Sequence, residues 1–192
     1  MSKALQPPVA KIIPKQLEKH GHVRIDNYYW LNERENPEVI EYLNQENKYY
    51  QQETAHTKDF QKELFEEMKA RIKEDDQSVP YLYNGYYYIT RFEKGKDYPI
   101  YARKKENLEA SEEILFDCNE MAKEHTYFQM VGLSVSDDNQ WISFGIDTVS
   151  RRQYAIQIKN LVSGEILPTK LENTTGGATW SADNRTLFYT RK

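Results

Sequence analysis

The stretch Leu133–Phe144, LSVSDDNQWISF, recurs 45 residues later as ATWSADNRTLFY at Ala178–Tyr189. Three polar positions are identical in the two copies: Ser136/Ser181, Asp138/Asp183 and Asn139/Asn184. A period of about 40–45 residues with strand–turn–strand texture is typical of a β-propeller blade. The second copy ends three residues before Lys192, partway through a blade. Because a propeller needs about four to eight blades to close, we expect the chain to be part of a longer protein.

Strand-like patterning begins near Ser78 and predicts two complete blades and part of a third. Asn84-Gly85 lies between two tyrosine-rich runs, and this dipeptide supplies the positive φ of a type I′ hairpin turn. The expected blades cover about 78–118, 129–171 and, incompletely, 176–192. The expected strands are Val79–Tyr83, Tyr86–Thr90, Tyr98–Arg103, Glu113–Asp117, Val131–Val135, Trp141–Ile146, Tyr154–Ile158, Ile166–Lys170, Ala178–Trp180 and Thr186–Thr190.

The region before the strands has helical texture. Residues 1–35, interrupted by three prolines, are expected to form an extended arm. Asn36 is a good N-cap and Pro37 suits the first helical position. A second helix is expected from about Thr57, with an apolar stripe at Phe60, Leu64, Phe65, Met68 and Ile72. Two helices with one apolar face each need a further surface, so we expect an arm-and-helix region at 1–76 and a partial propeller at 77–192.

Composition narrows the class of protein. The net charge of -4 gives no reason to expect nucleic acid, which usually requires a basic face. One cysteine, Cys118, excludes an internal disulfide and is compatible with a reducing compartment. No signal-peptide core follows Met1, and no apolar run approaches the ~20 residues of a membrane span. If Met1 is the natural start, a cytoplasmic location without membrane contact is expected.

The residues themselves predict no active site. No Gly-x-Ser-x-Gly nucleophile elbow occurs. Serines of the repeat are expected to cap turns, Asp137-Asp138-Asn139 to form a turn rather than a calcium loop, and Cys118 to pack. Two short basic runs, Arg103–Lys105 and Arg151-Arg152, are expected to be solvated or to protect exposed strands. The four histidines, His20, His22, His56 and His125, lack the spacing of a metal site. We therefore predict no catalytic, substrate-binding or metal-ligating residue and no cofactor.

Several strings resemble the prolyl oligopeptidase family of serine peptidases. His20–Leu31, HGHVRIDNYYWL, resembles the N-terminal motif of that family. Within the family the chain is most similar to the oligopeptidase B (protease II) group. The supporting strings are Arg71–Pro80, Tyr98–Lys104, Gly145–Tyr154, Glu172–Gly177 and Thr186–Arg191. The resemblance runs from about residue 7 to 192.

This resemblance implies an α/β-hydrolase domain with a Ser-Asp-His triad, covered by a seven-bladed propeller. The triad would follow the propeller, so the hydrolase domain is expected to be absent from these residues and the chain alone to be inactive. The resemblance implies cleavage of short peptides after Arg or Lys. The helices would pack on the protein's own C-terminal hydrolase domain. The propeller would gate and size-filter substrates, with Glu74–Ser78 as a hinge.

Two other interpretations stay open at this point. One is a non-catalytic binding or scaffold module that ends naturally at Lys192 and offers the edge of Thr186–Thr190 to a partner strand. The other is part of a prolyl-specific oligopeptidase, since the specificity pocket would lie outside these residues.

Overall fold

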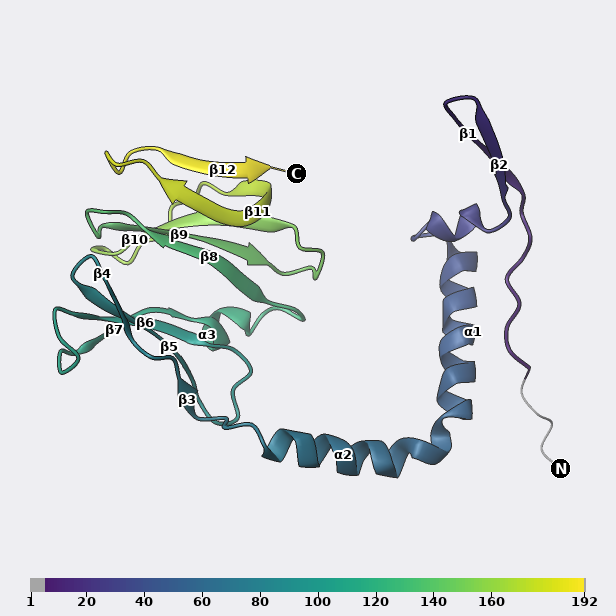
Figure 1. Ribbon diagram of the computed structural model, residues 1–192, viewed down its shortest axis with the longest axis horizontal. Coiled ribbons are helices and arrows are strands. Elements are labelled where there is room, and N and C mark those ends of the chain that lie inside the picture. Colours follow the sequence, from purple (N-terminus) through teal and green to yellow (C-terminus); the bar gives the residue numbers. More distant parts are fainter. Residues whose placement is uncertain (1–5, 192) are drawn as a thin grey trace. The chain divides into compact units, whose positions relative to one another are not determined.

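The computed structural model describes residues 6–191, and it divides the chain into two compact units. The first unit extends to Ile72 and the second begins at Lys73 (Figure 1). The domain limits inferred from the sequence, 1–76 and 77–192, stay a prediction.

The first unit begins with a hairpin that the sequence did not predict. Strands β1 (Lys15–Lys19) and β2 (His22–Asp26) pair antiparallel within the arm that was expected to be extended. The turn between them has φ of 54° at His20 and 77° at Gly21, and glycine adopts such values at little cost. A 3₁₀ helix, η1 (Tyr29–Asn32), follows, and the indole N–H of its buried Trp30 donates to the Lys11 carbonyl at 3.0 Å.

Both predicted helices are present. Helix α1 (Pro37–Glu53) begins at the predicted cap, where the Asn36 side chain accepts a hydrogen bond from the Glu38 N–H at 2.9 Å. A short 3₁₀ helix, η2 (Ala55–Thr57), leads into α2 (Lys58–Ala70), one residue from the predicted start.

The second unit contains two five-stranded sheets. The first sheet runs β4–β5–β6–β7 as a meander, with β3 pairing the far end of β5. Asn84 and Gly85 have φ of 47° and 80°, as the predicted hairpin turn requires. The bounds are β3 (Asp76–Gln77), β4 (Tyr81–Tyr83), β5 (Tyr86–Phe92), β6 (Ile100–Lys105) and β7 (Glu112–Asp117), followed by α3 (Cys118–Ala122).

The second sheet has the order β12–β11–β10–β9–β8. Its strands are β8 (Gln129–Val135), β9 (Trp141–Asp147), β10 (Tyr154–Asn160), β11 (Leu171–Trp180) and β12 (Leu187–Arg191). The strand predicted at Ile166–Lys170 was wrong, because there only Ile166 forms an isolated bridge, to Lys159. Pro168 lies in the middle of that run, and proline has no N–H to donate to a strand ladder.

Strand β11 takes the place of the missing strand and also begins the next hairpin. Its first part pairs with β10 and its last part, Ala178–Trp180, pairs with β12. Between these parts Gly176, with φ of 91°, lies against Gly132 of β8 and Gly145 of β9. A Cβ atom on Gly132 or Gly145 would come within 2.2 Å or 2.5 Å of the Gly176 backbone. The close approach of β11 to β8 and β9 therefore requires glycine at positions 132 and 145. We call this contact of Gly176 with Gly132 and Gly145 the glycine crossing.

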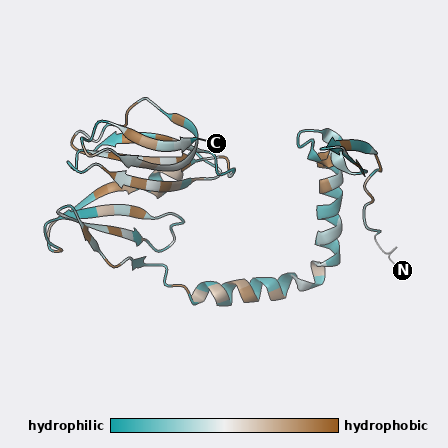
Figure 2. Ribbon diagram, turned by 45° about the horizontal axis from the view of Figure 1, so that its top comes forward, coloured by the Kyte–Doolittle hydropathy of each residue, from teal (hydrophilic) through white to brown (hydrophobic). Residues whose placement is uncertain are grey.

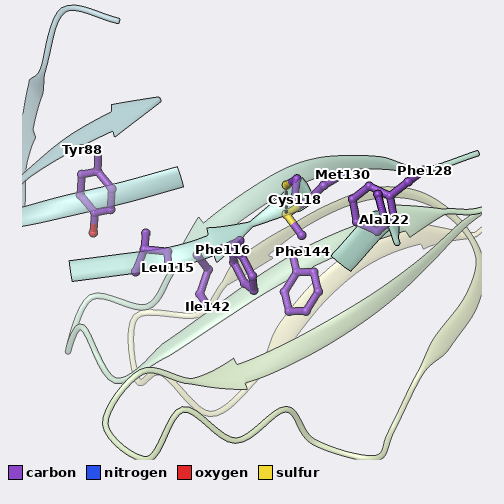
Figure 3. Packing of buried hydrophobic residues seen from close by; sticks show 9 residues of the cluster. All are labelled: Tyr88, Leu115, Phe116, Cys118, Ala122, Phe128, Met130, Ile142 and Phe144. Atoms are coloured by element: carbon purple, nitrogen blue, oxygen red, sulfur yellow. Dashed lines mark hydrogen bonds between the residues drawn. The ribbon is translucent and has the colours of Figure 1, made fainter. Parts of the chain in front are cut away.

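A buried cluster joins the two sheets (Figure 3). The rings of Phe116 and Phe144 meet with centroids 4.4 Å apart. Lys159 of β10 reaches across to the first sheet, where its Nζ donates to the Leu115 carbonyl at 2.7 Å. Burial lowers the pKa of this amine. The members of the cluster are Tyr88, Leu115, Phe116, Cys118, Ala122, Phe128, Met130, Ile142 and Phe144.

The glycine crossing predicts that two glycine-to-alanine substitutions change the free energy of unfolding very differently. Gly145→Ala should lower the free energy of unfolding by about 1–3 kcal/mol, because its methyl group overlaps the Gly176 backbone. Gly177→Ala is the matched control, since nothing lies within 4 Å of a Cβ there, and it should be neutral or stabilising by about 0.4–1 kcal/mol. Urea denaturation measures both, and equal effects would contradict the crossing.

Candidate functional site

The two repeat copies build the same turn. Ser136 Oγ donates to Asp138 at 2.5 Å and accepts from the Trp141 N–H at 3.0 Å. In the second copy Ser181 Oγ donates to Asp183 at 2.5 Å and accepts from the Thr186 N–H at 3.0 Å. These serines cap turns, as the sequence indicated.

Successive hairpin turns are bonded to one another through Asp137. The Asn84 side chain donates to the Asp137 carbonyl at 2.6 Å, and the Asp137 N–H donates to the Asn184 side chain at 2.8 Å. Figure 1 shows the three turns, β4–β5, β8–β9 and β11–β12, along one edge of the second unit. We call Asn84, Asp137 and Asn184 the turn stack. The sequence identified the turns separately but did not reveal these bonds between them.

The four histidines lie in three different parts of the chain. His20 and His22 belong to the β1–β2 hairpin, His56 lies in η2, and His125 stacks on Phe128 with ring centroids 6.2 Å apart. Within residues 6–191 no three His, Cys, Asp or Glu side chains are arranged to hold a metal ion.

Cys118 is a packing residue. It is the first residue of α3 and is 1% exposed, with its sulfur 3.9 Å from that of Met130. Burial raises the pKa of the thiol to about 12. Because the thiolate is the reactive form of cysteine, this side chain is not a nucleophile at neutral pH.

Asp147 organises the loop that carries Arg151 and Arg152, a role that the sequence analysis missed. Its buried carboxylate accepts hydrogen bonds from the backbone N–H groups of Val149, Arg151 and Arg152 at 2.8, 3.0 and 2.7 Å. Burial alone would raise the pKa of Asp147, but these backbone donors together lower it. Ser150 and Arg152 have φ of 60° and 53°, so the carboxylate holds a loop that is otherwise unfavourable. The signal available in the sequence was an aspartate at the end of a strand, followed by Arg151 and Arg152.

The predicted apolar stripe is exposed, and Figure 2 shows hydrophobic residues recurring among hydrophilic ones along α2. Phe60 is 63% exposed and Ile72 67% exposed, and Leu64, Phe65 and Met68 between them are also exposed. We call these five residues the α2 stripe. Contiguous exposed apolar surface usually marks an interaction site, which agrees with the expectation that this helix needs a further surface.

The segment that follows α2 joins the first sheet through the two residues of β3 and through Ser78, whose N–H donates to the Thr90 carbonyl at 2.8 Å and whose Oγ accepts from the Thr90 N–H at 3.0 Å. A Lys73–Asp76 ion pair at 2.9 Å is exposed. Glu74 accepts from the Gly95 N–H at 3.4 Å. This is the segment for which the sequence suggested a hinge.

None of the helices in the described part of the chain is both long enough and apolar enough to span a membrane.

Asp147 yields a pH-dependent prediction. Because its pKa is lower in the folded state than in the unfolded chain, its stabilisation is complete above the unfolded pKa and is lost as the pH falls through the folded value. Asp147→Asn should lower the free energy of unfolding by about 1–3 kcal/mol at neutral pH, and the difference should shrink below about pH 3.9. The exposed Asp97→Asn is the control. Urea denaturation across this pH range should show no such convergence if the loop does not depend on the carboxylate.

Comparison with known proteins places this architecture in a family. The profile described as "Prolyl oligopeptidase, N-terminal beta-propeller domain" matches residues 7–192. Dipeptidyl aminopeptidase BI of Pseudoxanthomonas mexicana is 40% identical over 98% of the chain, and Protease 2 of Moraxella lacunata is 35% identical over 95%. The structure of oligopeptidase B from Leishmania major aligns with a TM-score of 0.89 and 30% identity over 99% of the chain.

The chain spans 28% of the length of each of the two curated relatives and 29% of the Leishmania major protein. The α/β-hydrolase domain that the resemblance implied is absent from these residues. They match the N-terminal β-propeller domain, and their described sheets contain antiparallel pairs. The chain therefore belongs to the prolyl oligopeptidase family, of which it contains the N-terminal β-propeller region with its preceding helices.

Proposed function

We propose that this chain is the N-terminal part of an oligopeptidase B-like serine endopeptidase that hydrolyses short peptides after Arg or Lys in the cytoplasm. In this proposal the segment gates and size-filters substrates, contains no catalytic residue and is inactive alone. The α2 stripe carries the proposal, because an exposed apolar helix face is what a docking site on a second domain requires. The relatives named Protease 2 and oligopeptidase B support the peptidase assignment.

The partner of the α2 stripe in this proposal is the protein's own hydrolase domain. The stripe presents two phenylalanines, a leucine and a methionine on α2, and Ile72 follows two residues after the helix ends. Large apolar side chains each contribute about 1.5–3 kcal/mol when fully buried. Docking would therefore stabilise both the helix and the position of the propeller over the active site.

The contacts that join neighbouring blades support the proposed size filtering. The turn stack, the buried cluster and the Lys159–Leu115 hydrogen bond all connect the first sheet to the second. A ring built from such contacts is stiff, so its opening admits slender peptides and excludes folded proteins.

A scaffold module is the second candidate function, and one observation favours it. Strand β12 is the edge of its sheet and carries Phe188, which is 63% exposed. An exposed apolar edge can accept a partner strand. A prolyl-specific oligopeptidase is the remaining alternative, and the relative named as a dipeptidyl aminopeptidase adds a further cleavage mode to test.

Isolation of the native protein distinguishes these functions. An antibody to this segment should capture a protein several times heavier than 22.8 kDa that cleaves short peptides after Arg or Lys and is inhibited by a serine-directed reagent. The same Arg-containing sequence in a loop of a folded protein should stay intact. A native mass of 22.8 kDa without peptidase activity would instead support the scaffold module, and cleavage only after proline would support the prolyl-specific alternative.

The α2 stripe yields a matched pair of variants in the native enzyme. Leu64→Asp should lower peptidase activity or thermal stability of the whole enzyme, because it places a charge in the proposed interface at a cost of several kcal/mol. Gln61→Asp changes a polar position of the same helix and should have little effect. Thermal unfolding and peptide hydrolysis measure both. If the two variants behave alike, the stripe does not dock on another domain.

A further inference from the structure

A cavity of about 380 Å³ lies at one end of the cluster that joins the two sheets. It is lined by β4, β5, β6 and β7 on one side and by β8 and β9 on the other. Figure 3 shows Tyr88, Leu115 and Ile142, three of its lining residues, at that end of the cluster. We call this space the inter-sheet cavity. Its volume lies within the range of about 300–1,000 Å³ that is usual for ligand pockets.

The lining is aromatic and uncharged. Tyr81, Tyr83, Tyr88 and Tyr101 are joined by aliphatic side chains and by the hydroxyl residues Thr90 and Ser134, and no Asp, Glu, Lys or Arg lines the space. Aromatic rings pack favourably against other rings in offset or edge-to-face arrangements. A charged ligand group would lose its hydration here without gaining a counter-charge. The cavity therefore suits an uncharged aromatic group and does not suit an Arg or Lys side chain.

Tyr88 supplies an unsatisfied polar atom in this lining. The residue is 8% exposed, and its hydroxyl has no hydrogen-bond partner among residues 6–191. The guanidinium of Arg103, which is 3% exposed rather than solvated as expected, lies beside this hydroxyl, with its Nε and Nη2 bound to Glu113. Arginine can only donate hydrogen bonds, so the O–H of Tyr88 stays available for another acceptor. Burial raises the pKa of Tyr88, so the phenol stays protonated and can donate. A buried donor without a partner favours a ligand that brings an acceptor.

Two of the strands that line the cavity lie at the edges of their sheets. Strand β4 pairs with β5, and β8 pairs with β9 at the end of the strand order. Tyr81, which lines the cavity and stacks on Tyr88 with centroids 5.4 Å apart, is 62% exposed. An extended peptide can add to an exposed strand edge while its side chains enter neighbouring pockets. This edge favours a peptide over a free small molecule as the occupant.

We propose that the inter-sheet cavity binds an uncharged aromatic side chain of a peptide whose backbone lies along β4, with a polar atom on the ring accepting a hydrogen bond from Tyr88. This inference rests on the proposed function for the identity of the peptide as a substrate. It adds a binding site for a residue remote from the cleaved bond. This site prefers an uncharged aromatic residue, whereas the residue proposed to precede the cleaved bond is a basic Arg or Lys.

Direct binding to the native protein, with any reactive serine blocked by a covalent serine-directed reagent, tests this proposal by isothermal titration. Acetyl-Ala-Tyr-Ala-amide and acetyl-Ala-Phe-Ala-amide should bind at least tenfold more tightly than acetyl-Ala-Arg-Ala-amide. N-acetyl-tyrosinamide, which lacks the flanking residues, should bind more weakly than the tyrosine tripeptide. Equal affinity of these two tyrosine compounds would overturn the strand-edge part of the proposal. Equal affinity of the aromatic and arginine peptides would overturn the site.

Two variants identify the atoms involved. Tyr88→Phe should weaken the tyrosine peptide about 2- to 10-fold, as expected for one hydrogen bond, and should leave the phenylalanine peptide unchanged. Val135→Phe, on the face of β8 that packs against the cluster, should fill the cavity and abolish binding of both peptides, whereas Ser111→Phe in an exposed loop should not. Circular dichroism and thermal unfolding check that each variant is folded. Undiminished binding by folded Val135→Phe would place the peptide elsewhere and overturn the proposal.

This test separates the cavity from the proposed function, because binding is measured without catalysis. A native enzyme that cleaves after Arg or Lys, combined with a cavity that binds no aromatic peptide, would refute only the site. Aromatic binding by a native protein without peptidase activity would refute only the enzymatic proposal.

Discussion

The contact of Gly176 with Gly132 and Gly145 is the constraint on which the second unit depends. It allows β11 to leave the edge of β10, pass over β8 and β9 and begin the next hairpin with β12. With a side chain at Gly132 or Gly145 the strand would be displaced from the sheet. The two contacts that depend on this path, Asp137 with Asn184 and Trp180 Nε1 with the Ser134 carbonyl, would then be lost. Backbone packing at one point therefore sets how one blade follows another.

The contacts between the two sheets also explain why the inter-sheet cavity is present beside a well-packed core. The cluster around Phe116 and Phe144 closes the sheets together at one end, and the turn stack holds them at the edge where the hairpins turn. Between these two attachments the large rings of Tyr81 and Tyr88 stack within their own sheet. They do not fill the gap toward β8, and the inter-sheet cavity is the result. The cavity is thus a consequence of how twisted sheets meet, which no short sequence motif encodes.

Local rules predicted most elements, whereas contacts between elements escaped them. Asn36 with Pro37 placed the start of α1, and Asn84-Gly85 placed the first hairpin turn, because each signal acts within a few residues. The prediction of a strand at Ile166–Lys170 was wrong because it gave the apolar residues more weight than Pro168. The bonds of Asp147 to the following loop and the link between Asn84 and Asp137 required the folded arrangement. No catalytic residue was predicted, and that stays a prediction.

The two units differ in how far they can stabilise themselves. Among the described residues of the first unit, the buried apolar side chains are those of Trp30 and Val39, whereas the second unit contains the whole inter-sheet cluster. Helices are stabilised mainly by packing of an amphipathic face rather than by propensity. The α2 stripe is such a face, and it is exposed. In the proposed docking, much of the free energy that orders this helix would come from the surface that covers the stripe, so docking and folding of the first unit would be coupled. A mutation in the stripe would consequently affect the whole protein more than it affects this chain alone.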